Sequence, residues 1–298
     1  MSTIQKDSAT LDQLLIKAVT ECGLLVEVLR LDKVHPVISG NKWFKLNHYL
    51  QTAIQSNKKK ILTYGGPWSN HLVATAAACN ELGLASIGIV RGEKPKKMSA
   101  TLEEAQDWGM KIEYLSRENY LLQKRVQHDQ DEELLIIPEG GYGVLGVKGI
   151  AAISERVASS NYSHLLCAVG TGTMLAGLIN SMPPSCTCIG IPVLKGKQAL
   201  EKAIESLLLV KNRSWELKDG FEWGGYAKHP PALIQFMNHF FVETNIPTDI
   251  VYTGKLFYAF TQLIKQQYFK EGNKILLIHS GGLQGNRSLE PDQLHFKY

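Results

Sequence analysis

The sequence predicts an α/β protein in which a mostly parallel sheet is covered by helices on both faces. From Asn41 onward, short apolar segments typical of strands alternate with segments typical of helices, and the connections between them are short. Four glycine-rich turns follow such segments, at residues 65–66, 140–141, 170–172 and 281–282. In sheets of this kind, ligands bind beyond the carboxyl ends of the strands. We therefore expect the four turns to surround one shared site.

Each expected element can be placed along the chain. A helix should begin at Asn41, whose side chain can cap it, and continue through Leu50. An alanine-rich helix is expected at residues 72–82, and helical patterns also lie near residues 101–108 and 118–126. Strands are expected at residues 61–64, 85–90, 111–115, 134–138, 164–169, 187–192 and 274–279.

Composition limits the class of protein. The 298 residues are 44% hydrophobic and 20% charged, which suits one large domain or two modest domains with a buried core. The formal net charge is only +4 and the basic residues are scattered, so we expect no nucleic-acid partner. The five cysteines match no disulfide or zinc spacing, so we expect free thiols and no metal site. No signal-peptide or membrane-spanning pattern is present, and we expect a cytoplasmic protein with no membrane partner.

A glycine–threonine turn is the sharpest local signal. Val169, Gly170, Thr171, Gly172 and Thr173 follow an apolar strand and open a helix. The free amides at a helix N-terminus form an anion site, and a phosphate fits there. The spacing is neither that of a P-loop nor that of a dinucleotide fingerprint. A tight turn that holds no ligand remains the alternative.

The second signal is Lys42, in the segment 39–46 (Ser-Gly-Asn-Lys-Trp-Phe-Lys-Leu). It should lie in the first turn of a helix among apolar neighbours. Partial burial would lower its pKa and make the neutral amine available for a Schiff base with an aldehyde. The residue alone would equally fit a surface lysine whose stem covers apolar surface.

The third signal is the segment 65–71 (Gly-Gly-Pro-Trp-Ser-Asn-His), between a strand and a helix. Ser69 can cap the helix, which would be a purely structural role. Alternatively, Ser69, Asn70 and His71 present polar groups and free amides to a carboxylate or a phenolic oxygen.

Together these segments resemble the pyridoxal 5′-phosphate (PLP) enzymes of fold type II. The branch they resemble contains 1-aminocyclopropane-1-carboxylate (ACC) deaminase and D-cysteine desulfhydrase. The resemblance runs over most of the chain and rests on the order of the motifs, which is more specific than any one of them. The motifs are Asn-Lys at 41–42, Gly-Gly-x-x-Ser-Asn-His at 65–71, Pro-x-Gly-Gly at 138–141, Gly-Thr-Gly at 170–172, Val-Tyr-Thr-Gly-Lys at 251–255 and His-Ser-Gly-Gly at 279–282.

This resemblance implies roles for individual residues in binding and catalysis. Lys42 would hold PLP as a Schiff base, and Asn70 would contact the 3′-oxygen of the cofactor. Ser69 and His71, together with Asn70, would lie at the carboxylate of a small amino-acid substrate. The segment 169–173 would hold the phosphate.

The resemblance also implies a pair of active-site tyrosines, Tyr252 and Tyr226. Each could instead be a core aromatic residue. Thr253 and Ser280 would contact the cofactor, where ACC deaminases usually carry glutamate and leucine. In this respect the chain looks like the D-cysteine desulfhydrases. A hydroxyl, unlike a carboxylate, does not favour protonation of the pyridine nitrogen, and this suits loss of a good leaving group from Cβ.

The expected reaction is α,β-elimination from D-cysteine. Lys42 would take the Cα proton as a general base, thiolate would leave, and pyruvate and ammonia would follow. ACC deamination, β-replacement and a binding protein without catalysis are the alternatives. The chain departs from the family pattern at Phe44, Trp68 and Gly143, and Trp68 could reshape the substrate pocket.

The resemblance finally implies an architecture and an assembly. A large PLP-binding domain would comprise residues 1–44 and 144–298, and a smaller inserted domain would comprise residues 45–143. The cofactor would lie in the cleft between two open, twisted, mostly parallel sheets. The protein would be a homodimer.

Overall fold

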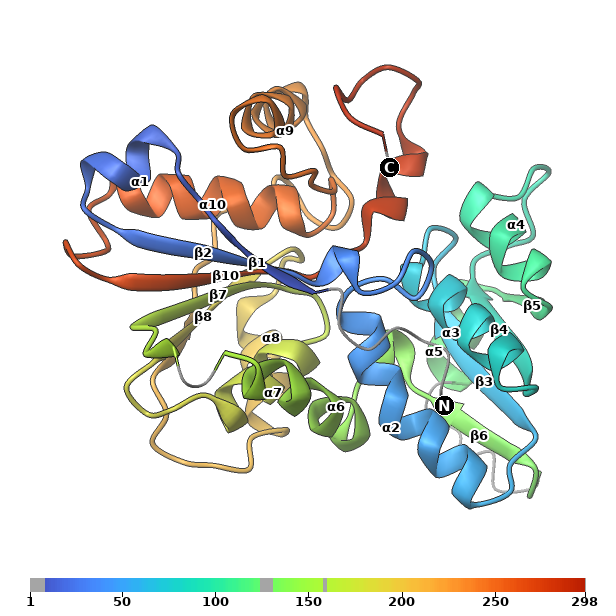
Figure 1. Ribbon diagram of the computed structural model, residues 1–298. Helices are drawn as coiled ribbons and strands as arrows, with labels where there is room; N and C mark the ends of the chain where they lie inside the picture. The colour runs from blue at the N-terminus through green and yellow to red at the C-terminus, as the bar shows by residue number, and fades with distance from the viewer. Residues whose placement is uncertain (1–8, 124–130, 158–159, 298) are drawn as a thin grey trace.

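A computed structural model describes residues 9–123, 131–157 and 160–297 and contains two β-sheets (Figure 1). The six-stranded sheet has the order β1-β2-β10-β7-β8-β9. Its strands are parallel except for the pair of β1 and β2. They comprise β1 (Thr10–Gln13), β2 (Leu25–Arg30), β10 (Lys274–His279), β7 (His164–Val169), β8 (Thr187–Pro192) and β9 (Trp215–Leu217).

The four-stranded sheet has the order β5-β4-β3-β6, and all its neighbouring strands are parallel. These strands are β5 (Met110–Leu115), β4 (Ala85–Arg91), β3 (Lys60–Gly65) and β6 (Leu134–Ile137). The expected fold class, an α/β protein with two mostly parallel sheets, is confirmed.

Helices cover both faces of the larger sheet, as Figure 1 shows. Helices α1 (Lys17–Glu21), α9 (Pro231–Thr244) and α10 (Thr253–Lys265) lie on one side, and α6 (Val144–Glu155), α7 (Thr173–Ser181) and α8 (Lys197–Glu205) lie on the other. The remaining helices are α2 (Asn41–Gln55), α3 (Asn70–Glu81), α4 (Ala100–Asp107) and α5 (Arg117–Gln123), with short 3-10 turns at Leu31–Lys33, Glu139–Gly141 and Leu283–Ser288.

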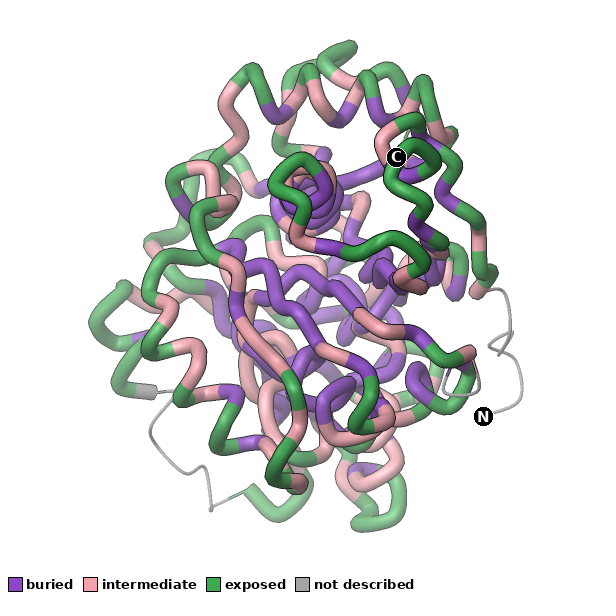
Figure 2. The backbone as a smooth tube through the Cα atoms, turned by 90° about the vertical axis from the view of Figure 1, so that its left-hand side faces the viewer, coloured by how far each residue is buried: buried purple, intermediate pink, exposed green. Residues whose placement is uncertain are grey.

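The central strand β10 shows why the large sheet is apolar on both faces. Leu276 and Ile278 pack with the helices α6 and α7, whereas Ile275 and Leu277 pack with α1 and α10. All four side chains are fully buried. Figure 2 shows buried residues along the strands in the centre of the molecule. Alternate side chains of a strand point to opposite faces, so a strand between two helical layers reads as an uninterrupted apolar run.

The strands expected from the sequence are all present, but the start of α2 differs from the expectation. Its N-cap is Gly40, with a φ of 67°, and no side chain caps the helix. Asn41 is the first helical residue, so its expected role as the cap is wrong. The antiparallel strand β1 and the strands β2 and β9 were not foreseen. The expected helix at 118–126 corresponds to α5, and its last residues lie outside the described residues.

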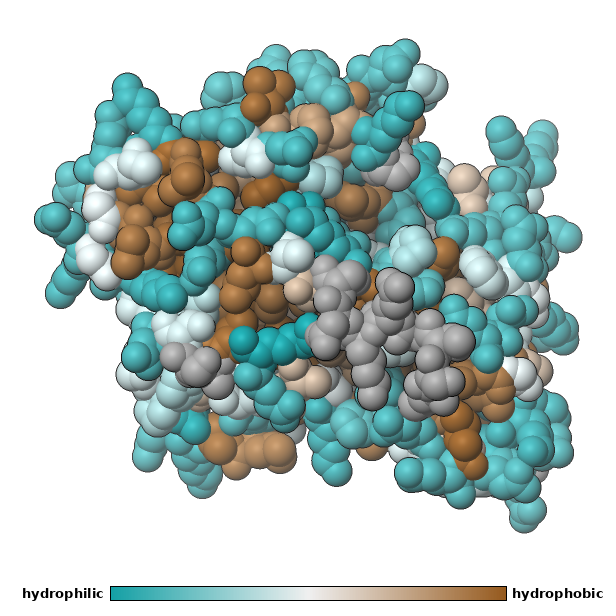
Figure 3. All heavy atoms as spheres, viewed as in Figure 1, coloured by the Kyte–Doolittle hydropathy of each residue, from teal (hydrophilic) through white to brown (hydrophobic). Residues whose placement is uncertain are grey.

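Apolar side chains gather on part of the surface, over α1 and the start of β2 (Figure 3). Leu15 is 73% exposed and Leu25 is 60% exposed there. The five cysteines are free, as expected, and only Cys22 is exposed. Within the described residues, no helix combines the length and apolarity needed to cross a membrane.

Candidate active site

A cavity of about 560 Å³ opens at the carboxyl ends of strands from both sheets. The segments after β3, β4 and β6 line one side, and those after β7 and β10 line the other. The N-terminus of α2 contributes as well. This volume is typical of a site for a small ligand or cofactor.

The cavity brings together most of the site residues expected from the sequence. The expected residues that line it are Lys42, Ser69, Asn70, His71, Val169, Gly170, Thr171, Gly172, Tyr226, Tyr252 and Ser280. Thr173 and Thr253 do not line it, although both were expected to contact the cofactor. Both are fully buried.

Lys42 projects from the first turn of α2, where Nζ donates a hydrogen bond to Asn41 Oδ1 at 3.0 Å. Burial lowers the pKa of Lys42 to about 8, although the negative charge of Asp249 opposes the shift. About a tenth of the amine is therefore neutral at pH 7, and a neutral amine can attack an aldehyde.

A close backbone contact holds this turn of α2 in place. The Asn41 amide donates to the carbonyl of Ser280 at 3.0 Å. A Cβ atom on Gly40 would lie only 1.8 Å from that carbonyl oxygen. Only glycine permits both this approach and the positive φ, and the contact places Lys42 beside the end of β10.

The N-terminus of α3 presents amides and polar side chains to the cavity. Ser69 is the N-cap, but its side chain makes no capping hydrogen bond, so the hydroxyl is available to a ligand. Asn70 Nδ2 donates to the Gly282 carbonyl at 3.1 Å. Asn70 Oδ1 is buried and has no partner among the described residues. A buried amide that lacks a partner at a cavity wall indicates that a ligand completes its hydrogen bonds.

The tautomer of His71 follows from its neighbours. Thr63 Oγ1 donates its only hydrogen to the Ile137 carbonyl at 2.7 Å, so the His71 Nε2–H must donate to Thr63 Oγ1, 2.8 Å away. Nδ1 is then a bare acceptor, buried without a partner among the described residues. Burial, with the charges of Lys42 and Lys45, holds the pKa of His71 well below its usual value. The ring therefore cannot donate to a carboxylate, and the backbone amide of His71 is the group that can.

The glycine–threonine turn forms a cup between β7 and α7. Gly172 is the N-cap of α7, with a φ of 85°, and the hydroxyls of Thr171 and Thr173 lie 3.1 Å apart. The first amides of a helix have no partner within it, and the helix dipole favours an anion there. The buried Thr173 can still contribute its amide to this cup.

Tyr226 and Tyr252 stand edge to face across the cavity, with ring centroids 6.4 Å apart. Lys42 Nζ lies 5.8 Å from the centroid of the Tyr252 ring. Burial raises the pKa of both tyrosines, so both hydroxyls stay protonated. Tyr252 donates its hydrogen to Tyr226, which leaves the hydrogen of the Tyr226 hydroxyl for a ligand.

Thr253 is committed to a buried carboxylate instead of the cavity. Its hydroxyl donates to Asp249 Oδ1 at 2.7 Å and accepts from the Asp249 amide at 2.7 Å. Asp249 also accepts from the amides of Val251, Tyr252 and Thr253, at 2.8, 2.9 and 2.8 Å. Since the one hydroxyl hydrogen is used, Thr253 cannot offer it to a cofactor. Thr253 instead helps to position Asp249, which in turn holds the backbone amide of Tyr252.

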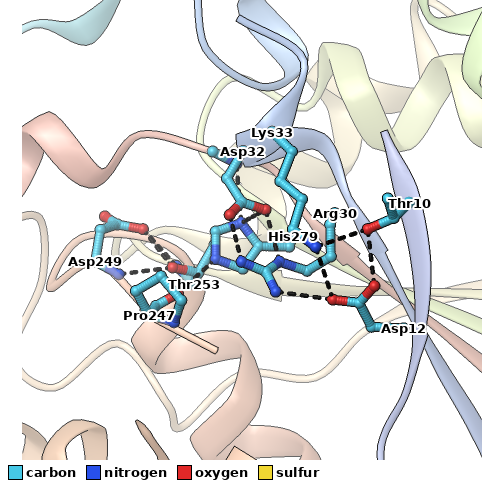
Figure 4. A network of polar contacts seen from close by, with 10 residues as sticks. Thr10, Asp12, Arg30, Asp32, Lys33, Pro247, Asp249, Thr253 and His279 are labelled. Carbon is cyan, nitrogen blue, oxygen red and sulfur yellow. Dashed lines mark hydrogen bonds and ion pairs between the residues drawn. The ribbon is translucent and has the colours of Figure 1, made fainter. Parts of the chain in front are cut away.

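A polar network lies behind the end of β10 (Figure 4). His279 Nε2 donates to the Pro247 carbonyl at 2.7 Å, and Nδ1 lies 3.1 Å from Asp32 Oδ1. Arg30 donates to both oxygens of Asp32, at 2.9 and 2.6 Å. Burial opposes ionisation of Asp32, but the charges of His279 and Arg30 outweigh it and hold the pKa of Asp32 below its usual value. The network fixes the strand end that carries Ser280.

Three charged residues line the cavity that sequence reasoning missed: Lys45, Arg91 and Glu139. Lys45 follows Lys42 by about one helical turn and is only 5% exposed, with Nζ 3.4 Å from the Gly140 carbonyl. Its helical spacing from Lys42 was the signal in the sequence. Arg91 ends β4, and no local pattern marks it, whereas Glu139 begins the 3-10 turn after β6 and is the variable position of the Pro-x-Gly-Gly motif.

Of the three departures from the family pattern, only Trp68 lines the cavity, where it is 39% exposed. Phe44 is buried in the core beneath the large sheet. Gly143 is the N-cap of α6, and its φ is 122°. The departures at Phe44 and Gly143 thus concern packing and backbone, whereas Trp68 shapes the site.

Comparison with known proteins agrees with this geometry. Residues 19–281 match the model of one family, described as pyridoxal-phosphate dependent enzyme. The chain belongs to this family of pyridoxal-phosphate dependent enzymes. A putative 1-aminocyclopropane-1-carboxylate deaminase of Pyrococcus horikoshii is 28% identical, with 89% of this chain and 86% of that protein covered.

Two further relatives narrow the branch of the family. The mitochondrial bifunctional D-cysteine desulfhydrase/1-aminocyclopropane-1-carboxylate deaminase of Arabidopsis thaliana is 28% identical, over 83% of this chain and 70% of that protein. The crystal structure of an ACC deaminase homologue superimposes with a TM-score of 0.82 at 25% identity, covering 95% of this chain and 92% of that one. The expected resemblance, PLP as the cofactor and an enzyme of this kind are confirmed.

The cavity fits PLP on its own chemistry. A lysine amine of lowered pKa, a helix N-terminus shaped as an anion cup and a buried amide without a partner line one space. PLP carries one group for each of them: an aldehyde for the lysine amine, a phosphate for the anion cup and a ring hydroxyl for the buried amide.

Proposed function

We propose that this enzyme is a lyase that removes ammonia from a small amino acid, with D-cysteine preferred over ACC and with pyruvate, ammonia and sulfide as the products from D-cysteine. The observation that carries the proposal is Lys42, whose amine has a pKa of about 8 in the cavity that also holds the anion cup. The names of the relatives, which include both D-cysteine desulfhydrase and ACC deaminase, support the reaction class.

Lys42 would hold the aldehyde of PLP, and the cup at residues 169–173 would hold the phosphate. Lys45 is buried next to the cup, since its Nζ and the Thr171 side chain both neighbour Gly140. Burial lowers the pKa of Lys45 far below its usual value, and a bound phosphate would restore its positive charge. Bound PLP supplies an electron sink for the Cα–H bond that must break.

Residues of the chain would carry out proton transfer, binding of the substrate carboxylate and protonation of the leaving group. The amine of Lys42, freed when the substrate amine takes its place at the aldehyde carbon, would accept the Cα proton as a general base. The Ser69 hydroxyl and the amides at the start of α3 bind the substrate carboxylate. The protonated hydroxyl of Tyr226, which accepts a hydrogen bond from Tyr252, can donate to the leaving group.

Thr253 favours the desulfhydrase reaction over ACC ring opening. It stands where ACC deaminases usually carry glutamate, and its hydroxyl donates to Asp249, so position 253 offers no carboxylate that would favour a protonated pyridine nitrogen. A neutral ring suits the loss of a good leaving group from Cβ. ACC deamination to 2-oxobutyrate and ammonia is the second candidate, favoured by the name of the Pyrococcus horikoshii relative.

The test compares products from two substrates. Purified yellow protein should release pyruvate and sulfide from D-cysteine faster than it releases 2-oxobutyrate from ACC. Borohydride should fix the cofactor on the peptide that contains Lys42, and Lys42→Ala should abolish both labelling and turnover. Faster release from ACC would reverse the choice of substrate. Labelling at Lys45 would overturn the assignment of the lysine.

We also propose the finer features of organisation. The division into residues 1–44 with 144–298 and residues 45–143 is supported by the membership of strands in the two sheets. Closure of these two parts on the substrate would shield the reaction from water. The family resemblance supports a homodimer, and the cytoplasmic location is the expectation from the sequence pattern. Sedimentation of the holoenzyme at twice the mass of the chain, and recovery in the cytosolic fraction, would test them.

A further inference from the structure

Arg91 ends strand β4 and lines the cavity on the side of the small sheet. Its Nη2 lies 4.0 Å from the position that a Cβ atom of Gly66 would take. The guanidinium carbon lies 6.0 Å from the centroid of the Tyr120 ring. Tyr120 is only 1% exposed and packs edge to face with Tyr64, at 5.8 Å. A rigid aromatic platform therefore holds the guanidinium beside the turn at Gly66.

Arg91 is exposed at the cavity and lies near Tyr120 and Tyr226, as the carboxylate of Glu139 does, but it forms no ion pair within the described part of the chain. The carboxylate of Glu139 lies near Tyr120, whose pKa is raised by burial and then by this charge. A planar guanidinium that faces a cavity and forms no ion pair among the described residues is suited to bidentate binding of a carboxylate.

The loop that follows Arg91 adds positive charge at the mouth of the cavity. Lys94, Lys96 and Lys97 are exposed in this loop, and Glu93 is its one acidic residue. The loop is tied to the substrate turn, because Ser99 Oγ donates to the Pro67 carbonyl. Charges arranged in this way attract anionic ligands.

The other anions of the reaction already have their sites. The cup at residues 169–173 and Lys45 suit the phosphate, and the start of α3 suits the carboxylate at Cα. Arg91 ends β4 and is not part of the cup, so it is available to bind a third anionic group. We propose that Arg91 selects substrates whose β-substituent carries a carboxylate, so that the leaving group is an anionic thiol. This inference rests on the proposed lyase function.

Two substrates of matched size test the inference. S-Carboxymethyl-D-cysteine carries the carboxylate, and S-carbamoylmethyl-D-cysteine replaces it with a neutral amide. In each case the Cβ–S bond breaks, the sulfur leaves as a thiol after gaining a proton, and one water converts the remainder to pyruvate and ammonia. The wild-type enzyme should prefer the carboxymethyl compound by at least about 10-fold in kcat/KM, the effect of one charge-assisted hydrogen bond.

Variants at two arginines separate recognition from general effects. Arg91→Gln should lower kcat/KM for the carboxymethyl compound about 10- to 100-fold and leave the carbamoylmethyl compound and D-cysteine within about threefold. Arg91→Lys should keep part of the preference, since it keeps the charge and loses the planar fork. Arg117→Gln is the matched control, because Arg117 is exposed on the same part of the chain and does not line the cavity.

The outcomes distinguish failure of the inference from failure of the proposed function. Equal rates for the two matched compounds in the wild type, or an equal loss on all substrates in Arg91→Gln, would overturn the role of Arg91. Turnover of none of the three compounds would overturn the lyase function. Calorimetry on the holoenzyme then still tests Arg91. Succinate should bind at least about 10-fold more weakly to Arg91→Gln than to the wild type, and the monoamide succinamate should not. Unchanged succinate binding would refute the inference.

Discussion

Replacement of Asp249 by asparagine tests how the structure holds Tyr252. The Asp249 side chain is fully buried and accepts four hydrogen bonds, from the amides of Val251, Tyr252 and Thr253 and from the Thr253 hydroxyl. Asparagine keeps one acceptor oxygen and places an NH₂ group where the other oxygen stood. If Oδ2 is the atom replaced, the amides of Val251 and Tyr252 lose their acceptor and face a donor.

The expected cost follows from those two amides. A buried donor left without a partner costs about 1–3 kcal/mol, so Asp249→Asn should lower the free energy of unfolding by about 2–5 kcal/mol. Urea unfolding of the cofactor-free protein, followed by circular dichroism, measures this change. The matched control is Asp219→Asn. That carboxylate is half-exposed and pairs with Lys197, so its loss should cost no more than about 1 kcal/mol.

The same substitution should also change the amine of Lys42. The charge of Asp249 raises the pKa of Lys42, so its removal should move that pKa below about 8. The midpoint of PLP uptake against pH should shift downward accordingly, while Asp219→Asn leaves it in place. A destabilisation by Asp249→Asn of less than about 1 kcal/mol, with an unshifted midpoint, would refute the reasoning for this cluster.

Three further predictions concern the lysines and the glycine contact. Gly40→Ala should reduce PLP binding more than 10-fold, because the new Cβ atom would clash with the Ser280 carbonyl. Gly83→Ala is the control, since Gly83 has a similar φ of 66° but open space around it. This variant should lose only about 1 kcal/mol of stability through backbone strain and should bind PLP normally. The rate of PLP uptake should rise from pH 7 to pH 9 with a midpoint near 8, since the neutral fraction of the Lys42 amine increases in that direction, and a flat profile would contradict the assigned pKa. Lys45→Met should weaken PLP binding about 10- to 100-fold in a spectrophotometric titration, with borohydride labelling still at Lys42. Unchanged affinity would exclude Lys45 from phosphate binding.

The sequence alone determined the fold class and the location of the site. Apolar runs such as residues 274–279 are local, and they indicate a parallel sheet buried on both faces whatever the rest of the chain does. The glycine turns at their ends predicted a common ligand site, and Lys42 stood out because its motif has a fixed order relative to the others. These features are properties of the linear sequence, so they can be recognised without the three-dimensional structure.

The tertiary structure decided which polar groups face that site. Thr253 lies in the predicted motif, but Asp249 takes its only hydroxyl hydrogen. His71 lies in another, but Thr63 sets its tautomer. Arg91 carries no sequence signal, and only the meeting of strand ends from the small sheet with the cavity brings it there. Hydrogen-bond direction and burial arise from contacts between distant segments, so no local pattern contains them.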